Sequence, residues 1–307
     1  MTLTITRQHP LFFAEVSGVD LTKPVPSDIF ASIKFAFHEH AILLFRDQHI
    51  DDAQQVAFSA LFGPVFTSTK YHRDGEVSRL RSEMADISNI DHNGAILAAD
   101  DDSRLHSQGN ALWHTDNSFK HIPARCSLLS AREIPPTGGE TEFADMRAAY
   151  DALPDTRKQE INALIVEHSI FRSREQLGYD GFSDGARKEL PPVQQVLVRT
   201  LADTGRKALY IASHASHVTG DLNGDAADWP LAKSRELIAE LIGFATQPQF
   251  VHAHEWRPGD LIVWDNRCTM HRARPYDDMT QRRVLHRTTV SDEINSVEQV
   301  EKNRAPR

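Results

Sequence analysis

Hydrophobic residues recur along the chain with two different spacings, and these spacings predict helices separated by short strands. Ser27 is a favourable N-cap for an amphipathic helix that runs to about His40. Asp51 is placed to cap a second helix over residues 52–61. Helical spacing returns in the middle of the chain, over residues 145–153, 155–168 and 226–245.

Short apolar or alternating runs predict strands, which outnumber the helices. Residues 41–45 are apolar throughout, as expected of a buried strand, and residues 1–25 contain short strands. The other predicted strands are 86–90, 111–119, 126–131, 140–143, 195–199, 208–212, 249–256, 260–264 and 283–290. No internal repeat or linker divides the chain. We therefore predict a single domain over 1–307 of mainly β class, a sandwich or jelly roll with flanking helices.

One long stretch, residues 67–109, is mostly polar and irregular. Loops of this length in compact domains are usually functional lids or disordered segments. Because the stretch leads directly into His114, we predict an active-site lid. Lys70, Tyr71 and His72 lie where such a lid would approach a substrate, and a solvated loop is the alternative for these three residues.

The composition is that of an ordinary soluble globular protein. Of the 307 residues, 40% are hydrophobic and 25% are charged. The net charge of -9 argues against a nucleic-acid partner, because binding to a phosphate backbone needs a basic surface. A small anionic substrate is compatible with this charge if local arginines recruit it. Two cysteines, Cys126 and Cys268, are too few for a disulfide framework and are predicted to be buried thiols.

We expect a cytoplasmic protein. The first residues lack the basic-then-apolar layout of a signal peptide, and no apolar run approaches the length of a membrane span. Residues 169–195 are rich in loops, and the polar tail at 294–307 is predicted to be loose. The sequence leaves open whether the protein forms a homo-oligomer.

Candidate chemistry centres on His114-Thr-Asp116. Residues two apart on a strand project to the same face, so one strand can offer an imidazole and a carboxylate side by side. His271 is the best candidate for a third ligand. Two histidines and one carboxylate on one face of a metal leave positions open for other ligands, which is the ligand set of non-haem Fe(II) oxygenases. A hydrogen-bonded surface pair is the alternative for His114 and Asp116.

Arginines beyond His271 add a second feature. Arg283 and Arg287 are four apart, so on a strand both would point inward, while Arg282 would point outward. Two inward guanidinium groups are costly to bury unless each meets an anion, and guanidinium pairs with carboxylate in a bidentate manner. The pattern predicts carboxylate-bearing ligands near one metal, with structural salt bridges as the alternative.

These motifs together resemble the taurine dioxygenase/2,4-D dioxygenase (TauD/TfdA) family of Fe(II)- and 2-oxoglutarate-dependent oxygenases. The resemblance extends from about His9 to Val290 and is strongest to the 2,4-dichlorophenoxyacetate (aryloxyalkanoate) branch. It is carried by the motifs His114-x-Asp116, Gly138-Gly-Glu-Thr-Glu-Phe143, Trp264-Asp-Asn-Arg-x-x-x-His271 and Gln281-Arg-Arg-x-x-x-Arg287, and by the segments 143–154 and 205–218. It implies a double-stranded β-helix core (jelly roll, cupin-like).

The resemblance also implies roles for individual residues. His114, Asp116 and His271 would hold Fe(II). The cosubstrates would be 2-oxoglutarate and O2, and the 2-oxoglutarate would be bound by Thr141 and Arg283, with Trp264 beside it or, as the alternative, simply in the core. The residues that would contact a small anionic substrate are Arg287, Asn110, His214, Ser216 and His217, and hydrogen-bonded loop residues are the alternative for the last three.

The implied reaction is hydroxylation of an aryloxyalkanoate such as 2,4-D, with cleavage of the ether to a phenol and glyoxylate and formation of succinate and CO2. The same chemistry on a sulfonate, a sulfate ester or another organic acid is the alternative within the family. Two alternatives from other classes are a zinc hydrolase, since two histidines and a carboxylate also bind Zn²⁺, and a non-catalytic ligand-binding protein.

Overall fold

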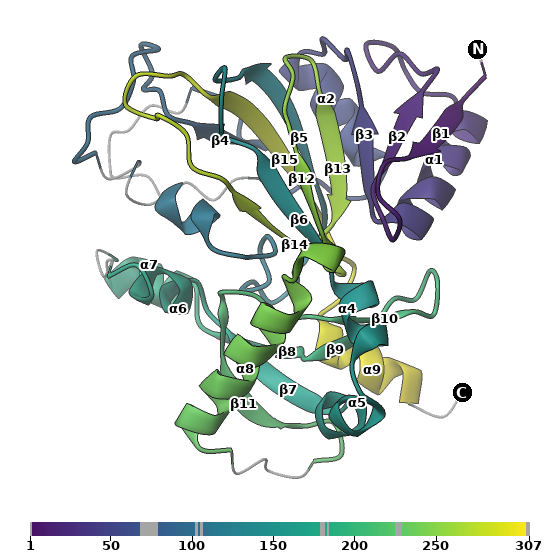
Figure 1. Cartoon of the computed structure of the whole chain (residues 1–307), viewed down its shortest axis with the longest axis vertical. Coiled ribbons are helices and arrows are strands. Elements are labelled where there is room, and N and C mark those ends of the chain that lie inside the picture. Colours follow the sequence, from purple (N-terminus) through teal and green to yellow (C-terminus); the bar gives the residue numbers. More distant parts are fainter. Residues whose placement is uncertain are drawn as a thin grey trace.

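A seven-stranded sheet occupies one end of the molecule, at the top of Figure 1. The computed structural model describes residues 2–67, 79–101, 104, 107–178, 182, 184–224 and 229–304. The strand order is β1-β2-β3-β13-β5-β15-β4, and only the β2–β3 pair is parallel. The strands are β1 (Thr4–Arg7), β2 (Ala14–Ser17), β3 (Ile42–Phe45), β13 (Leu261–Asp265), β5 (Ala124–Glu133), β15 (Val284–Ser291) and β4 (Met84–Ser88).

The central strands are buried on both faces, and alternate residues enter two different cores. On β3, Leu43 and Phe45 pack with Phe37 and Phe58 from the two helices that cover one face, whereas Ile42 belongs to the core on the other face. These helices are α1 (Ser27–His40) and α2 (Asp52–Ala60). Because successive side chains of a strand point to opposite faces, an unbroken apolar run such as that of β3 is what two covered faces require.

A smaller sheet lies against the opposite face, in the order β12-β6-β14. Its strands are β12 (Val251–His254), β6 (Thr141–Asp145) and β14 (Thr269–Ala273), all antiparallel. Phe143 of β6 and Met270 of β14 are fully buried in the same core as Trp264 of β13. The predicted mainly β character is thus confirmed, and the space between these two sheets holds the candidate site.

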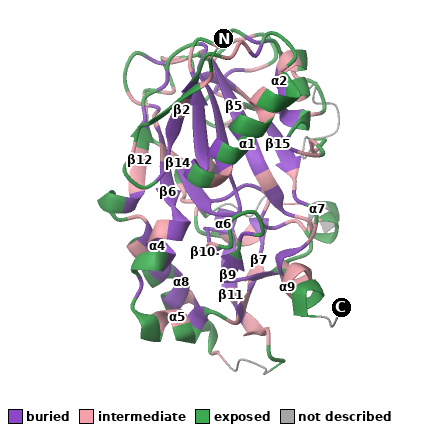
Figure 2. Cartoon of the chain, turned by 90° about the vertical axis from the view of Figure 1, so that its right-hand side faces the viewer, coloured by how far each residue is buried: buried purple, intermediate pink, exposed green. Residues whose placement is uncertain are grey.

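Helices and two more small sheets form the other end of the molecule, at the bottom of Figure 1. Figure 2 shows that their helices are partly buried and expose one side to solvent, as in α8, where Leu237, Ile238 and Leu241 are buried. The strands are β7 (Leu164–His168), β8 (Val193–Val196), β9 (Val198–Thr200), β10 (Lys207–Leu209) and β11 (Ala215–Asp221). The helices are η1 (Gln108–Ala111), α4 (Met146–Ala152), α5 (Asp155–Ile161), α6 (Ile170–Glu175), α7 (Asp184–Glu189), α8 (Leu231–Ala245), η2 (Pro248–Phe250) and α9 (Ser296–Arg304). No helix in the described ranges has both the length and the apolarity needed to cross a membrane.

Several predicted elements are confirmed, including the capped second helix. The Asp51 carboxylate accepts a hydrogen bond from the backbone N–H of Gln54, whose side chain returns one to Asp51, so the capping box is complete. Helix α1 covers the predicted residues, but Pro26 takes the N-cap position and Ser27 is already helical. The helix predicted at 226–245 is described from Leu231, after Pro230.

The helix predicted at 155–168 is wrong in its second half. Helix α5 ends at Ile161, and Leu164-Ile-Val-Glu-His168 is strand β7. The run was short and apolar, so its spacing did not separate a strand from a helix, and pairing on both sides with β8 and β11 decided in favour of the strand. Part of the loop-rich stretch at 169–195 is also regular, since it contains α6, α7 and the start of β8.

The predicted strand over 111–119 is also wrong, since only His114 makes a bridge and Asn117 has a positive φ of 54°. The loose tail predicted at 294–307 contains helix α9. Its first residue, Ser296, is buried, and its hydroxyl donates to Gln195 Oε1 at 2.6 Å. This hydrogen bond joins two distant parts of the chain, so the polar sequence of the tail did not predict it.

Two buried ion pairs fasten the two ends of the molecule together. Arg147 and Asp145 are both fully buried, and Arg147 also donates to the His38 and Glu39 carbonyls at the end of α1. Burial alone would lower the pKa of Arg147, but the Asp145 carboxylate reverses this and raises it above its ordinary value.

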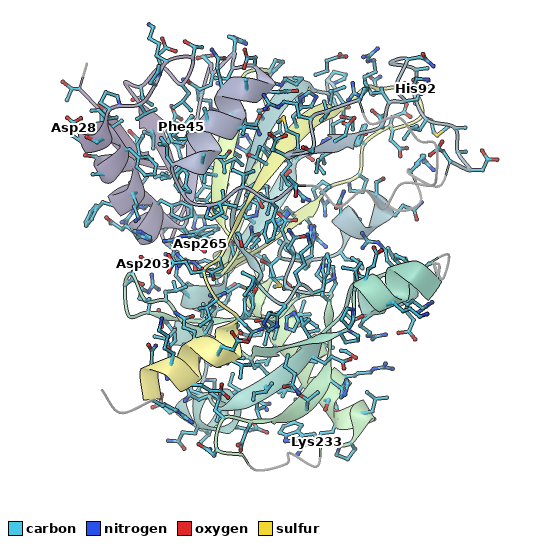
Figure 3. All side chains as sticks on the ribbon, turned by 180° about the vertical axis from the view of Figure 1, so that it is seen from behind. Asp28, Phe45, His92, Asp203, Lys233 and Asp265 are labelled. Carbon is cyan, nitrogen blue, oxygen red and sulfur yellow. The ribbon has the colours of Figure 1, made fainter. Side chains whose placement is uncertain are left out.

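A similar bridge joins two loops. Arg267 donates to both Asp265, at 2.8 Å, and Asp203, at 2.9 Å. Figure 3 shows these two aspartates close together on the back of the molecule.

Removing Arg147 should test this role. We expect Arg147→Leu to lower the free energy of unfolding by about 3–5 kcal/mol, because the Asp145 carboxylate would remain buried without its cation. Arg157→Leu is the matched control, since Arg157 forms ion pairs with the exposed Glu160 and Glu240 and should contribute about 1 kcal/mol or less. Denaturant unfolding of both variants measures the difference, and equal losses would contradict the prediction.

A candidate metal centre between two sheets

His114 and His271 face each other across an isolated antiparallel bridge. The His114 N–H donates to the His271 carbonyl at 3.0 Å, and the His271 N–H donates back at 2.8 Å. Their ring centroids lie 4.1 Å apart. His271 is on β14, which the sequence did not predict as a strand, and the bridge fixes the two imidazoles side by side although they are distant in the sequence.

The Asp116 carboxylate completes a compact cluster. Its Oδ1 lies 4.0 Å from His114 Nε2, and its Oδ2 lies 3.9 Å from His271 Nε2. One ligand atom from each of the three residues lies within 4.8 Å of the others, and all three residues are buried. The structure therefore brings the three predicted metal ligands together.

The protonation states suit a divalent metal. Burial lowers the pKa of His114 and, more strongly, of His271, so both imidazoles are neutral near pH 7. Burial opposes ionisation of Asp116, but Arg287, the two histidines and a hydrogen bond from Ser127 outweigh it and lower the pKa of Asp116 to about 2.

One hydrogen bond also orients a ligand ring. The Nδ1 of His114 lies 2.8 Å from the Leu112 carbonyl, so Nδ1 carries the proton and Nε2 keeps its lone pair for a metal. A neutral imidazole in this tautomer, with the ionised Asp116 beside it, fits the chemistry of a metal site.

Arg283, the residue just before strand β15, is a buried arginine. Arg283 is 5% exposed, its Nε donates to the Gly139 carbonyl at 3.0 Å, and its Nη2 lies 3.4 Å from Thr141 Oγ1. Burial lowers the pKa of Arg283 to about 10, although Tyr276 and Glu140 act to raise it. Within the described residues Arg283 forms no ion pair with a carboxylate, so its charge is available to an anionic ligand.

The predicted orientation of the neighbouring arginines is confirmed. Arg282 is exposed and pairs with Glu133, while Arg287 points inward and its Nη1 donates to Asp116 Oδ1 at 2.5 Å. The Nε of Arg287 is buried and has no hydrogen-bond partner in the described part of the chain. Arg287 thus contacts one of the three candidate metal ligands directly, and its Nε remains available to donate to an anion.

Three other predicted residues surround the cluster of His114, Asp116 and His271. Trp264 is fully buried, and its ring centroid lies 4.7 Å from that of His271, so it packs in the core behind a ligand. Asn110 is half-buried on η1, just before the segment that carries His114. His214 is buried, its ring centroid lies 6.3 Å from that of His114, and it packs edge-on against Phe119.

The structure does not bring Ser216 and His217 to the cluster. Ser216 lines a small cavity beside α8, together with Arg235. His217 lies 3.7 Å from Glu167 on β7 and 3.0 Å from the Ser216 hydroxyl. Both residues follow the turn at His214 and already belong to β11. The predicted lid residues Lys70, Tyr71 and His72 lie outside the described residues.

Two residues outside the predicted set complete the surroundings of Asp116. Ser127 on β5 donates to Asp116 Oδ2 at 2.7 Å, and Asn266 accepts from the Asp116 N–H at 3.1 Å. Asn266 belongs to the motif Trp264-Asp-Asn-Arg, so the sequence marked its neighbourhood. Ser127 had no signal of its own, because its role depends on the pairing of β5 with β13 and β15.

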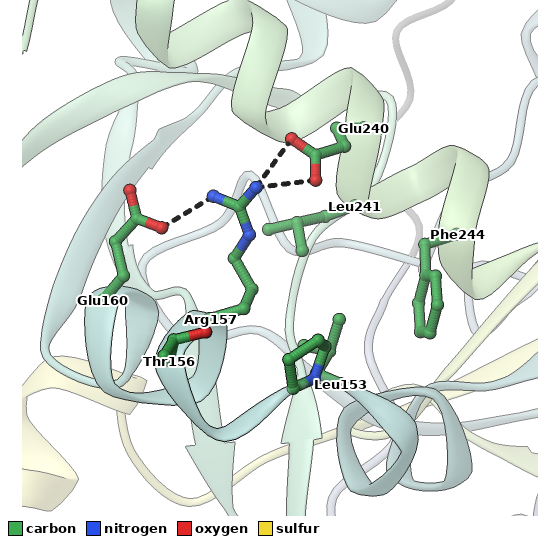
Figure 4. A pocket seen from close by; sticks show the side chains of 8 residues that line it. Leu153, Thr156, Arg157, Glu160, Glu240, Leu241 and Phe244 are labelled. Atoms are coloured by element: carbon green, nitrogen blue, oxygen red, sulfur yellow. Dashed lines mark hydrogen bonds and ion pairs between the residues drawn. The ribbon is translucent and has the colours of Figure 1, made fainter.

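A surface pocket of about 470 Å³ lies elsewhere, between α5 and α8 (Figure 4). Leu153, Leu241 and Phe244 form its apolar wall. Arg157 is held there by both carboxylate oxygens of Glu240, at 2.7 and 3.0 Å, and by Glu160 at 2.6 Å. These carboxylates neutralise the arginine, and none of the cluster residues lines this pocket.

The chain is similar to known proteins along most of its length. The family model described as taurine catabolism dioxygenase TauD, TfdA family matches residues 4–289. An alpha-ketoglutarate-dependent 2,4-dichlorophenoxyacetate dioxygenase of Cupriavidus pinatubonensis is 42% identical, over 96% of this chain and 100% of that protein. An (S)-phenoxypropionate/alpha-ketoglutarate-dioxygenase of Sphingobium herbicidovorans is 36% identical, over 91% and 92%. The crystal structure of AAD-2 in complex with Mn(II) and N-oxalylglycine superposes with a TM-score of 0.86 at 42% identity, over 96% and 99%.

A substitution at Gly139 should test the placement of Arg283. Gly139 has a φ of +73°, and a Cβ there would lie 3.2 Å from Arg283 Cδ and Nε. We expect Gly139→Ala to shift the guanidinium and weaken binding of 2-oxoglutarate roughly tenfold, as measured by calorimetry.

Gly205→Ala is the matched control, because Gly205 has a φ of +70° but open space around it. Both variants should lose about 1–2 kcal/mol of stability from backbone strain, but only Gly139→Ala should lose affinity. Equal 2-oxoglutarate affinities in the two variants would contradict the assigned contact.

Proposed function

The chain belongs to the TauD, TfdA family of dioxygenases, and from this we propose that it is an Fe(II)- and 2-oxoglutarate-dependent enzyme that hydroxylates an aryloxyalkanoate. The observation that carries the proposal is the buried cluster of His114, Asp116 and His271. Arg287 donates to Asp116 of this cluster, and Arg283 is buried without a carboxylate partner among the described residues. The names of the relatives at 42% and 36% identity supply the substrate class, since they act on 2,4-dichlorophenoxyacetate and on (S)-phenoxypropionate.

His114, Asp116 and His271 would hold the iron. Two neutral imidazoles and one carboxylate leave room in an octahedral sphere for a cosubstrate and O2. When bound, Fe(II) together with 2-oxoglutarate and O2 supplies the oxidation of a substrate C–H bond, with release of succinate and CO2. The contribution of the chain is to keep the ligands deprotonated and aligned in a buried site.

Arg283 and Thr141 would bind the distal carboxylate of 2-oxoglutarate. The supporting observations are the burial of Arg283, its proximity to Thr141 and the absence of a carboxylate partner for it among the described residues. The Trp256 indole N–H donates to Thr141 Oγ1 at 2.9 Å, so the Thr141 hydroxyl proton is left to point toward an incoming carboxylate. A carboxylate that meets both groups replaces the hydration that the guanidinium lost on burial.

Arg287 would orient the substrate by its carboxylate. Its Nη1 is held by Asp116, which fixes the side chain next to the metal ligands, and its buried Nε offers a further donor. His214 packs edge-on against both His114 and Phe119, and an aryl group would pack against these rings. Asn110 lies on η1, four residues before His114, and would be a further substrate contact. This arrangement would hold the carbon next to the carboxylate toward the metal, which is catalysis by positioning.

The outcome for an aryloxyacetate is cleavage of the ether. Hydroxylation of the carbon between the ether oxygen and the carboxylate gives a hemiacetal, which separates into a phenol and glyoxylate. One oxygen atom of O2 enters this carbon and the other enters succinate, so the atoms balance. No protein base is required for the separation.

Two wider inferences belong to the same proposal. The seven-stranded sheet and the β12-β6-β14 sheet would together form the double-stranded β-helix core of the family. The protein would be a single domain and cytoplasmic. Of the lid predicted at 67–109, residues 84–88 are instead strand β4 of the seven-stranded sheet, and residues 68–78 lie outside the described ones. The alternative substrates within the family, sulfonates and sulfate esters, are less favoured, because relatives of 42% and 36% identity act on aryl ethers, whereas a sulfate ester dioxygenase of Pseudomonas putida is 29% identical.

A substrate panel tests the function. Anaerobically purified protein is loaded with Fe(II), and succinate is measured with phenoxyacetate, phenoxypropionates, a cinnamate-like acid, taurine and an alkyl sulfate. We expect phenol release and succinate in equal amounts with an aryloxyalkanoate. Asp116→Ala is the negative control and should lose metal retention and turnover together. Coupled turnover with taurine alone would overturn the aryl assignment, and bound zinc without 2-oxoglutarate turnover would favour a hydrolase.

Arg287 gives a sharper prediction about the substrate. We expect Arg287→Ala to raise the KM for phenoxyacetate about 30-fold or more, because a buried charge-assisted contact is lost, while slow uncoupled consumption of 2-oxoglutarate persists. Arg282→Ala is the matched control, since Arg282 is exposed and pairs with Glu133. Initial-rate kinetics measure both variants, and an unchanged KM in Arg287→Ala would remove Arg287 from its role.

A further inference from the structure

A buried polar network lies directly behind Asp116. It consists of Asn266, Ser127 and the indole of Trp264, which are 0% exposed. The network touches both the backbone and the carboxylate of Asp116. Its hydrogen bonds to the candidate ligands all end on Asp116 within the described residues, while the Trp264 ring also packs against that of His271, with centroids 4.7 Å apart.

The donors around Asn266 fix the direction of its side-chain amide. The Trp264 Nε1–H lies 2.9 Å from Asn266 Oδ1, and the Asp116 backbone N–H lies 3.1 Å from it. Both groups can only donate, so the atom between them must be the amide oxygen. The amide nitrogen of Asn266 then necessarily faces Ser127 Oγ, at 2.9 Å.

This direction in turn fixes the proton of Ser127. Because Ser127 Oγ accepts from Asn266, its own hydroxyl proton is free to donate, and Asp116 Oδ2 lies 2.7 Å away. The other acceptor within reach, Thr289 Oγ1, is more distant at 3.5 Å. The chain of hydrogen bonds therefore runs in one direction, from Asn266 to Ser127 to Asp116.

We propose that Asn266 is a positioning residue that acts through Ser127 to hold the Asp116 carboxylate in its metal-binding orientation. The Ser127 hydroxyl holds Oδ2 while Arg287 holds Oδ1, so the hydrogen bond from Ser127 restrains rotation of the carboxylate beside His114 and His271. The inference rests on the proposed metal site. Hydrogen bonds of this kind to metal ligands commonly change metal affinity 10–100-fold.

Ser130 provides a control within the same strand. Ser127 and Ser130 are both buried on β5, but Ser130 Oγ donates to Gln55 Oε1 at 2.7 Å, on the side that faces α2. Ser127→Ala and Ser130→Ala thus remove the same hydroxyl from the same strand. Both should lower the thermal midpoint, so a merely structural role for Ser127 would give the two variants the same metal affinity.

The experiment is a titration of the full chain with Mn(II), followed by the electron paramagnetic resonance signal of the free ion. We expect Ser127→Ala to bind Mn(II) about 10–100-fold more weakly than the parent and Ser130→Ala to bind it with the parent affinity. Thermal unfolding confirms that each variant is folded. Parent-like Mn(II) affinity in Ser127→Ala would overturn the proposal.

Asn266→Asp distinguishes an effect of carboxylate positioning on Mn(II) affinity from an effect of added negative charge. The new carboxylate still accepts from Trp264 and from the Asp116 N–H, but it cannot donate to Ser127, so the Ser127 hydroxyl would turn toward residue 266. We expect weaker Mn(II) binding, whereas an added negative charge acting only through electrostatics would tighten it. Tighter binding would therefore contradict the proposal.

The double variant completes the test. If Asn266 acts through Ser127, adding Asn266→Asp to Ser127→Ala should cause no further loss of Mn(II) affinity, and additive losses would overturn the proposed connection. The Mn(II) affinity of the parent protein distinguishes failure of the proposed metal site from failure of the positioning role. A parent that binds no Mn(II) would refute the metal site itself, whereas a parent that binds it beside an unaffected Ser127→Ala would refute only the positioning role.

Discussion

The paired backbone hydrogen bonds between His114 and His271 are the contact on which the candidate site depends. His114 lies in a segment that is otherwise irregular, and Asn117 next to it has a left-handed backbone conformation. Without the bridge, nothing regular would hold that segment against β14. The bridge sets the two imidazoles, and Asp116 follows because Asn266 and Ser127 hold it from behind. Ligands that are distant in sequence thus converge through a few directed hydrogen bonds.

Buried arginines in this protein fall into two groups according to whether the chain supplies their anion. Arg147 and Arg267 each meet an aspartate two residues before them, and these ion pairs have a structural role. Arg283 is as deeply buried but meets only the Gly139 carbonyl and the Thr141 hydroxyl among the described residues. Since an uncompensated buried cation is unfavourable, the difference points to an anion that comes from outside.

Local signals in the sequence predicted most of what is local in the structure. The capping box at Asp51, the buried strand at 42–45 and the alternation of outward Arg282 with inward Arg283 and Arg287 all follow from neighbouring residues. The metal ligands were predicted from their spacing and from motifs that resemble a family. The strand at 164–168, the strand that carries His271 and the helix after Asn295 were not predicted, because each is decided by a partner from another part of the chain.

The same limit explains why Ser127 and Asn266 were not predicted, and why Ser216 and His217 were placed near the site. A serine within an apolar strand carries no local mark of function, and residues adjacent to His214 in sequence need not share its direction. His214 ends a turn and faces His114, whereas the next residues enter β11 and turn toward α8 and β7.

Arg287 links the substrate to the metal centre in the proposed function. Its guanidinium already donates to Asp116, and burial makes each of its donors costly to leave unpaired. A metal bound by Asp116 would compete with Arg287 for the same carboxylate oxygen, and a substrate carboxylate would give the arginine a new partner. The two binding events would therefore favour each other, because the substrate carboxylate would replace the Asp116 contact that Arg287 loses to the metal. A substrate without an anionic group cannot provide this compensation, which gives a physical reason for a preference for carboxylates at this site.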